Sequence, residues 1–235
     1  MGIFIVLEGG EGCGKSTQAR ILYGRLLQEG HISLLVNEPG GTALGNQIRH
    51  ILKSQHGEGQ KRRQSAIAPI AELLLFSAAR TQLVKDILHP ALADGRTVVC
   101  DRYTPSTIAY QGYGRNIPLG TIDHANRLAT GNLQPDLIVL LDMAPEKSLS
   151  RVAAQIHMVF DSEASETPGL REEEEGSRRF EEEPLSFHER VRAAYLDLAK
   201  VDQGRWLVVD AGLPIEQIAE AIWQRVAHTL QSKGS

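Results

Sequence analysis

The chain contains few cysteines and few aromatic residues, no excess of basic charge and no long apolar run. Its two cysteines do not make a disulfide framework, so we expect a reducing, cytoplasmic setting. A formal net charge of −4 gives no support to nonspecific binding of nucleic acid, which needs a basic surface. The apolar runs are too short to span a bilayer, and no basic segment precedes the first of them. We therefore expect no membrane partner, no nucleic-acid partner and no signal peptide.

Zinc chemistry is also not indicated, because the eight histidines lack the spacing of zinc ligands.

The chain does contain a regular alternation of apolar runs with helical patterns. The runs lie at 3–7, 34–36, 97–100, 137–141 and 206–209. This alternation, in a chain of 235 residues that is 42% hydrophobic, predicts a single domain over residues 1–235. We expect a three-layer α/β/α fold with a five-stranded parallel sheet.

A long helix is predicted over residues 67–92, from the spacing of its apolar positions. Polar residues follow the predicted strands at Glu8, Asn37, Glu38, Asp101, Asp142 and Asp210. In open parallel sheets, ligands bind at the carboxyl ends of the strands. We therefore expect the functional site along this edge.

The first apolar run leads directly into a complete phosphate-binding loop, G-x-x-x-x-G-K-S, over residues 9–16. Its glycines let successive backbone N–H groups turn around phosphate oxygens, and the following helix adds the positive end of its dipole. Lys15 would reach the β- and γ-phosphates, and the Ser16 hydroxyl would hold Mg²⁺. The predicted ATP-binding residues are Gly10, Glu11, Gly12, Cys13, Gly14, Lys15, Ser16 and Thr17. The alternative, a chance glycine turn, leaves the matching flanks unexplained.

Three further clusters narrow the reaction. Asp101 ends an apolar strand and could hold Mg²⁺ through water together with Ser16, while Arg102 beside it could clamp a phosphate with its planar fork. A salt-bridged strand end is the alternative. In the second cluster, Glu38 opens the tight turn Glu-Pro-Gly-Gly, and Arg49 in the following helix could point to the same place. An ordinary turn explains that segment equally well.

In the third cluster, Phe76 and Arg80 lie one helical turn apart on the same face. A phenyl ring can stack on a nucleobase while an arginine donates to a carbonyl oxygen. The alternative is a core phenylalanine followed by a solvated arginine, and periodicity alone favours it.

Taken in this order, the segments resemble the bacterial thymidylate kinases, which are nucleoside monophosphate kinases. The resemblance runs from about Ile3 to Val226. It is carried by LEGGEGCGKST at 7–17, EPGGT at 38–42, AELLLFSAAR at 71–80, DRY at 101–103, ST at 106–107, AYQG at 109–112, PDL at 135–137 and YL at 195–196. It implies a P-loop fold of the nucleoside monophosphate kinase type, transfer of phosphate from ATP to dTMP with Mg²⁺, and a homodimer.

The resemblance also implies roles for particular residues. Phe76 would stack on thymine, and Arg80 would address its O4 carbonyl. The remaining base edge would meet Thr107 and Gln111. The substrate-binding set that follows is Glu11, Glu38, Arg49, Phe76, Arg80, Arg102, Thr107, Tyr110 and Gln111. Within it, Arg49 and Arg102 would hold the monophosphate, Tyr110 would pack under the deoxyribose, and Glu11 would lie near the 3′-hydroxyl and the metal.

Catalysis would consist of positioning and charge neutralisation of an in-line transfer, because the attacking phosphate oxygen is already anionic. The expected catalytic residues are Lys15, Asp101, Arg102 and Arg179, with Asp101 orienting Mg²⁺ or its water and not acting as a base. Arg179 is included because the phosphate loop carries no arginine. In members of the family that lack this arginine, a mobile lid provides it. We expect such a lid here, with an insertion, at about 155–183.

The chain departs from the family pattern in two places. The lid is lengthened and acidic, so Arg171 and Arg178 compete with Arg179 as the lid arginine. Asn37 stands where the family usually has arginine. Two other functions remain open: a deoxynucleoside monophosphate kinase with another base specificity, such as dUMP, and a nucleotide-dependent switch. The switch interpretation expects an Asn-Lys-x-Asp motif, which the sequence lacks.

Overall fold

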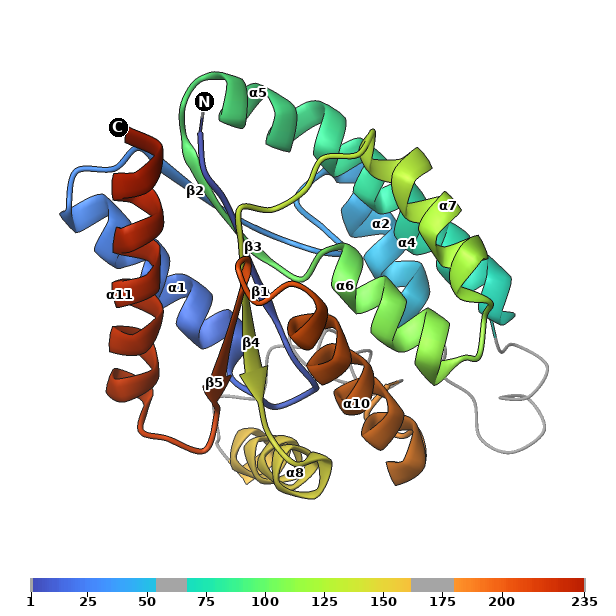
Figure 1. Cartoon of the computed structure of the whole chain (residues 1–235). Coiled ribbons are helices and arrows are strands. Elements are labelled where there is room, and N and C mark those ends of the chain that lie inside the picture. The colour runs from blue at the N-terminus through green and yellow to red at the C-terminus, as the bar shows by residue number, and fades with distance from the viewer. Residues whose placement is uncertain (1, 54–66, 162–179, 235) are drawn as a thin grey trace.

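A five-stranded parallel sheet forms the centre of the molecule (Figure 1). The computed structural model describes residues 2–53, 67–161 and 180–234. Its strands are β1 Phe4–Glu8, β2 Ser33–Asn37, β3 Thr97–Asp101, β4 Leu137–Asp142 and β5 Trp206–Asp210. They lie in the order β2-β3-β1-β4-β5, and every pair of neighbours is parallel. The predicted sheet is therefore confirmed.

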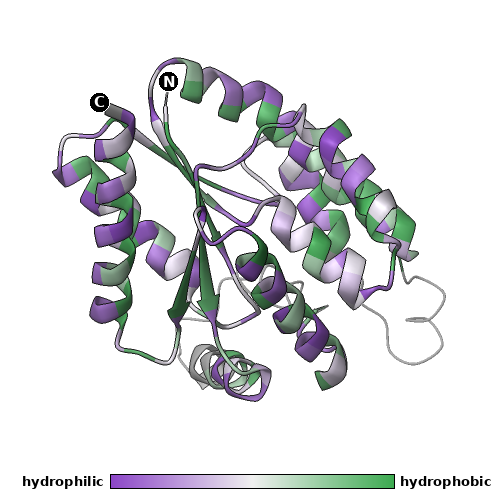
Figure 2. Ribbon diagram, in the orientation of Figure 1, coloured by the Kyte–Doolittle hydropathy of each residue, from purple (hydrophilic) through white to green (hydrophobic). Residues whose placement is uncertain are grey.

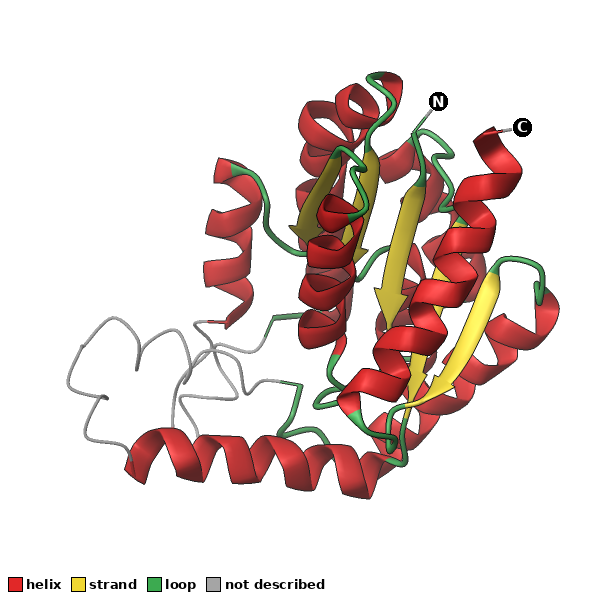
Figure 3. Cartoon of the chain, turned by 90° about the vertical axis from the view of Figure 1, so that its left-hand side faces the viewer, coloured by secondary structure: helices red, strands yellow, loops and turns green. Residues whose placement is uncertain are grey.

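Helices cover both faces of the sheet, which gives the three layers (Figures 1 and 3). On one face lie α1 Lys15–Gln28 and α11 Ile215–Gly234. The opposite side carries α2 Ala43–Lys53, α4 Pro69–Leu83, η1 Val84–Leu88, α5 His89–Ala93, α6 Thr104–Thr107, η2 Ile108–Gly114, α7 Leu119–Thr130 and α10 Leu185–Val201. Helix α8, Pro145–Asp161, lies across the carboxyl end of β4 (Figure 1).

The central strand β1 is apolar on both faces because both faces are covered. Successive side chains of a strand point to opposite sides. Ile5 and Leu7 therefore pack with α1 and α11, whereas Phe4 and Val6 pack with the helix that contains Leu83. The hydrophobic colouring of the inner strands in Figure 2 follows from this double burial. This burial on both faces explains why the sequence of β1 is a continuous apolar run and does not alternate with polar residues.

The helix predicted over 67–92 begins two residues later and changes its winding. Ala68 is extended, as residues before proline tend to be, and Pro69 occupies the first helical turn, where its missing N–H costs nothing. Between Val84 and Leu88 the helix widens into a π-turn. Pro90 lies two residues after this segment and has no N–H to donate to the carbonyl four residues before it, which is a common reason for such a local adjustment.

Two segments near the site add detail to the sequence expectation. Residues 104–114 form a continuous helical stretch, α6 and η2, that the apolar pattern did not indicate. At the other segment, α8 continues to Asp161, so residues 155–161 of the expected lid are helical. Residues 162–179, including Arg171, Arg178 and Arg179, lie outside the described residues.

Candidate active site

The strand-end polar residues gather at one edge of the sheet, as predicted, but each of five closes its strand instead of following it. Asn37 pairs with Asp101 in the ladder, and Asp142 pairs with Asp210. Arg192 holds both carboxylate oxygens of Asp142, at 2.8 Å each, and Asp210 caps the next turn. Asp142 is therefore bound to α10 and Asp210 to the turn after β5, while Glu38 and Asp101 line the cavity described below.

The phosphate-binding loop has the backbone that its glycines predict. Gly9, Gly12 and Gly14 all have positive φ angles. A Cβ on Gly12 would lie 2.3 Å from the carbonyl oxygen of Ser148, so glycine is required there by contact as well as by conformation. The loop is consequently pressed against α8 on one side and open to the cleft on the other.

Lys15 and Ser16 begin helix α1 directly after this loop. The Lys15 Nζ donates to the carbonyl of Gly10 at 2.6 Å, and burial lowers the pKa of Lys15. The Ser16 hydroxyl donates to Asp101 Oδ2 at 2.5 Å. The structure thus brings together the hydroxyl and the carboxylate that the sequence predicted as a metal pair. No group of three or more acidic, histidine or cysteine side chains among the described residues is arranged so that it could hold a metal ion.

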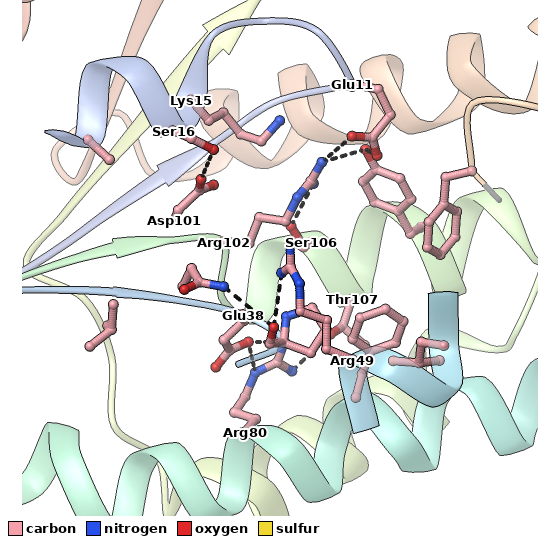
Figure 4. Close-up of a pocket in the computed structure, with 18 of the residues that line it drawn as sticks. Glu11, Lys15, Ser16, Glu38, Arg49, Arg80, Asp101, Arg102, Ser106 and Thr107 are labelled. Carbon is pink, nitrogen blue, oxygen red and sulfur yellow. Dashed lines mark hydrogen bonds and ion pairs between the residues drawn. The ribbon is translucent and has the colours of Figure 1, made fainter. Parts of the chain in front are cut away.

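Arg102 is the basic centre of the cleft and sits in a left-handed backbone conformation, with φ of 74°. One of its terminal nitrogens donates to Glu11 at 2.8 Å and to the Tyr110 hydroxyl at 3.2 Å. The other donates to the Gly9 carbonyl and to Ser106. Arg102 therefore ties the phosphate loop to the end of β3 (Figure 4).

The Glu11 carboxylate is strongly stabilised in its charged form. Burial alone would raise its pKa, but the charges of Arg102 and Lys15 and a 2.7 Å hydrogen bond from Tyr110 hold the pKa of Glu11 at about 2. Glu11 and Arg102 each keep 18% of their side-chain surface exposed. The pair is thus a charged, partly shielded element at the boundary of the cleft.

Sequence reasoning placed Glu8 at a strand end but gave it no role. It is fully buried and accepts hydrogen bonds from the backbone of Tyr103 and Ser106 and from the hydroxyls of Ser106 and Tyr195. Burial raises the pKa of Glu8. Because Tyr103 and Ser106 closely follow Arg102 in the chain, Glu8 fixes the loop on which Arg102 is held.

Arg80 lies at the far end of the cleft and is 1% exposed. Its Nε donates to Glu38 Oε2 at 2.8 Å, and its terminal nitrogens donate to Thr107, Asn126 and the Tyr103 carbonyl. One terminal nitrogen also lies 2.7 Å from the same Glu38 oxygen, which makes an ion pair. A direct bond from Arg80 to a base carbonyl therefore requires one of these to be exchanged. The solvated arginine of the alternative interpretation is wrong, since burial and ion pairing define this side chain.

One cavity of about 660 Å³ joins the two ends of the cleft (Figure 4). Predicted residues that line it are Glu11, Gly12, Gly14, Lys15, Ser16, Thr17, Glu38, Arg49, Phe76, Arg80, Asp101, Arg102, Thr107, Tyr110 and Gln111. Cys13 is absent from the lining because its side chain packs in the core behind the loop, and Gly10 contributes the carbonyl that binds Lys15. Asn37 also lines the cavity, as does Phe180, whose ring lies 6.4 Å from that of Phe76.

Glu38 has an unsatisfied, buried acceptor atom beside this cavity. Its Oε2 binds Arg80, but its buried Oε1 has no hydrogen-bond partner within the part of the chain that the structure describes. A donor on a bound ligand would satisfy that oxygen. Arg49 points to the neighbouring turn, where it donates to the Pro39 carbonyl at 3.1 Å.

The fold and the site together define a P-loop kinase of the nucleoside monophosphate kinase type. A phosphate loop opens one end of the cavity, and arginines and an aromatic side chain line the rest of it. The sequence profile described as thymidylate kinase matches residues 7–222. The chain belongs to the thymidylate kinase family.

Individual relatives agree over nearly the whole length. The chain is 44% identical to the thymidylate kinase of Geotalea daltonii over 222 residues, covering 94% of this chain and 95% of that protein. It is 45% identical to the thymidylate kinase of Citrifermentans bemidjiense, covering 96% and 93%. The crystal structure of thymidylate kinase from Ehrlichia chaffeensis superposes with a TM-score of 0.69 at 27% identity, covering 96% of this chain and 98% of that one.

The depressed pKa of Glu11 predicts a specific dependence of stability on pH. A carboxyl whose folded pKa lies below its unfolded value adds stability above the unfolded pKa and loses it as the pH falls through the folded one. We expect the difference in unfolding free energy between wild type and Glu11→Gln to shrink by roughly 2 to 3 kcal/mol as the pH falls from about 5 to about 2. Urea titrations across that range measure it. A difference independent of pH would contradict the ion pair.

Proposed function

We propose that the chain phosphorylates dTMP to dTDP with ATP, by direct in-line transfer of the γ-phosphoryl group. The observation that carries the proposal is the continuity of one cavity from the phosphate loop to the buried end at Arg80, with Arg102 and Arg49 on its wall. Two nucleotides that exchange a phosphoryl group must meet inside such a cavity. The relatives that bear the name thymidylate kinase support the choice of acceptor.

The chain's own residues would act by position and charge. The Lys15 amine would meet the β- and γ-phosphates of ATP, and Arg102 and Arg49 would hold the phosphate of dTMP. No general base is required, because the attacking oxygen is anionic before the reaction begins. Glu11 would act through Arg102, whose guanidinium it fixes by charge and hydrogen bond.

The donor set fits Mg²⁺. Ser16 and Asp101 offer a hydroxyl and a carboxylate oxygen in direct contact, and hard oxygen ligands suit this cation. Mg²⁺ is commonly held in kinases by one or two such protein groups together with the phosphates. When bound, the ion would neutralise charge on the phosphates; Asp101 would hold it directly or through water.

The base would lie at the other end of the cavity. Phe76 presents a ring there for stacking, and Thr107 and Gln111 offer polar atoms to the base edge. Tyr110 would pack under the deoxyribose; its hydroxyl is already committed to Glu11 and Arg102. Arg80 and Glu38 would form the polar floor of this end, with the Glu38 Oε1 ready to accept a hydrogen bond.

The remaining catalytic charge is assigned to Arg179, with Arg171 and Arg178 as alternatives; this is a proposal from the sequence.

We also propose a cytoplasmic homodimer. Ile70 and Leu74 lie one turn apart on α4 and are 50% and 59% exposed, which gives that helix an apolar outer face. Sedimentation as a monomer at micromolar concentration would contradict the dimer. Among the described residues, no helix is long and apolar enough to cross a membrane.

A nucleotide panel tests the proposed activity. We expect ADP release, measured with a coupled assay, to require an acceptor and to be fastest with dTMP. Preference for dCMP or a purine monophosphate would show a kinase of other specificity. Acceptor-independent hydrolysis that a protein partner accelerates would instead support the switch interpretation.

Phe76→Ala tests the placement of the base. Removing the ring deletes the stacking surface but leaves the phosphate loop and Arg102 in place. We expect KM for dTMP to rise about tenfold or more, because stacking of a base on an aromatic side chain contributes on the order of 1–3 kcal/mol. The KM for ATP should stay within about twofold, which serves as the internal control. An unchanged KM for dTMP would place the base elsewhere.

A further inference from the structure

Two uncharged side chains at the base end of the cavity are each bound from behind by an ionised group. Thr107 Oγ1 accepts a 2.8 Å hydrogen bond from Arg80, and Gln111 Nε2 donates a 2.6 Å hydrogen bond to Glu72 Oε1. Both Thr107 and Gln111 line the cavity. A charge behind such a group determines which of its atoms remains for a ligand.

Gln111 is the clearer case, because an amide can present either a donor or an acceptor. A carboxylate only accepts hydrogen bonds. The Gln111 NH₂ group must therefore face Glu72, and the carbonyl Oε1 is the side-chain atom left for the cavity. Rotating the amide by half a turn would place two acceptor oxygens about 2.6 Å apart, inside a fully buried contact. Gln111 is thereby fixed as an acceptor.

Glu72 is itself held in place. Its side chain is 0% exposed, and two nitrogens of Arg115 lie 3.4 Å from its two oxygens. A third Arg115 nitrogen donates to Glu183 at 2.5 Å. Burial opposes the charge of Arg115, and the two carboxylates more than offset this and raise its pKa. The arrangement keeps a negative charge behind Gln111 without leaving it uncompensated.

Thr107 has the opposite polarity. Because its oxygen accepts from the permanently charged Arg80, its hydroxyl proton is free to donate into the cavity. The wall thus offers a donor from Thr107 and an acceptor from Gln111, four residues apart on one helical stretch. Thymine and uracil present the complement, a carbonyl O4 beside N3–H. Cytosine presents the reverse, an amino group beside an unprotonated N3.

We propose that Glu72 is a specificity-determining positioning residue, which excludes cytosine by fixing Gln111 as an acceptor. The inference rests on the proposed dTMP kinase activity and deepens it. Glu72 has no contact with the base in this account and acts through the Gln111 amide. Discrimination arises because a cytosine would bring an acceptor nitrogen against the Gln111 oxygen, and a site built for a hydrogen bond strongly rejects a ligand that lacks the partner.

The test compares three acceptors in wild type and Glu72→Gln. The neutral amide of the variant can donate as well as accept, so Gln111 becomes able to turn. We expect the ratio of kcat/KM for dCMP over dTMP to rise about tenfold or more, and the ratio for dUMP over dTMP to stay within about twofold. The dUMP ratio is the readout that separates polarity from general damage, since uracil and thymine share this edge. An unchanged dCMP ratio in a folded variant would overturn the proposal.

Matched variants control for the loss of charge. Glu72→Asp keeps the carboxylate and should keep the wild-type dCMP ratio, even if overall activity falls. Glu183→Gln removes the other partner of Arg115 without touching Gln111 and should also keep the ratio. If Glu72→Gln does not fold, the double variant Glu72→Gln with Arg115→Gln removes the buried pair together, leaves only the partly exposed Glu183 without this partner, and carries the same expectation.

The wild-type enzyme supplies a check that needs no variant. We expect dUMP to exceed dCMP in kcat/KM by about a hundredfold or more, because the two differ only at the edge that Thr107 and Gln111 face. Equal use of dUMP and dCMP would overturn the proposal. Absence of turnover with dTMP would instead refute the proposed function, so the two failures are distinguishable.

Discussion

The ion pair between Arg102 and Glu11 is the interaction on which the rest of the site depends. It spans 91 residues of sequence and joins the phosphate loop to the carboxyl end of β3. Without Glu11, Arg102 would be a partly buried cation in a strained, left-handed backbone with its main counter-charge removed. With it, one guanidinium is held at the place where we propose that the phosphate of the acceptor binds. Glu8 completes this by binding the backbone beyond Arg102.

Two further ion pairs between an arginine and a buried carboxylate lie along the cavity. Arg80 is paired with Glu38, and Arg115 with Glu72, and in both pairs the carboxylate is almost completely buried. Burying a charged group removes its hydration, which offsets most of the attraction within the ion pair. These pairs therefore contribute more to the orientation of the side chains than to the stability of the fold. Each one fixes a neutral group or a loop at the cavity wall. The proposed catalysis by position and the proposed selection by hydrogen-bond polarity would then have a common physical basis in preorganised charge.

Much of the fold could be predicted from local pattern. The apolar runs identify all five strands, and the glycine loop with Lys15 identifies the phosphate site, because each signal lies within a few adjacent residues. Strand bounds differ because the ladder extends through the terminal polar residue, as at Asp101. The helical stretch over 104–114 and the two π-turns were missed, because their apolar periodicity is weak and a π-turn has no local sequence signature of its own.

The partners inside the site were harder to predict, because they come from distant parts of the chain. Glu72 and Gln111 are 39 residues apart, and nothing in the sequence beside either one indicates the other. Burial of Arg80 was missed for the same reason: its ion pair with Glu38 spans 42 residues. Hydrophobic periodicity predicts which face of a helix is buried, but it does not predict which charged side chain from another element pairs with that face. The lid arginine stays a prediction, because residues 162–179 are outside the described part of the chain.

The most direct test of the central claim, that Arg102 is a preorganised phosphate receptor, is calorimetric binding of dTMP and of thymidine to wild type and Arg102→Met. Thymidine lacks only the phosphate, so it reports on the base and sugar contacts alone. The account predicts that the variant loses about ten- to a hundredfold in affinity for dTMP, as for a charged hydrogen-bonded group, and less than about threefold for thymidine. Equal losses for both ligands, or unchanged affinity for dTMP, would contradict it.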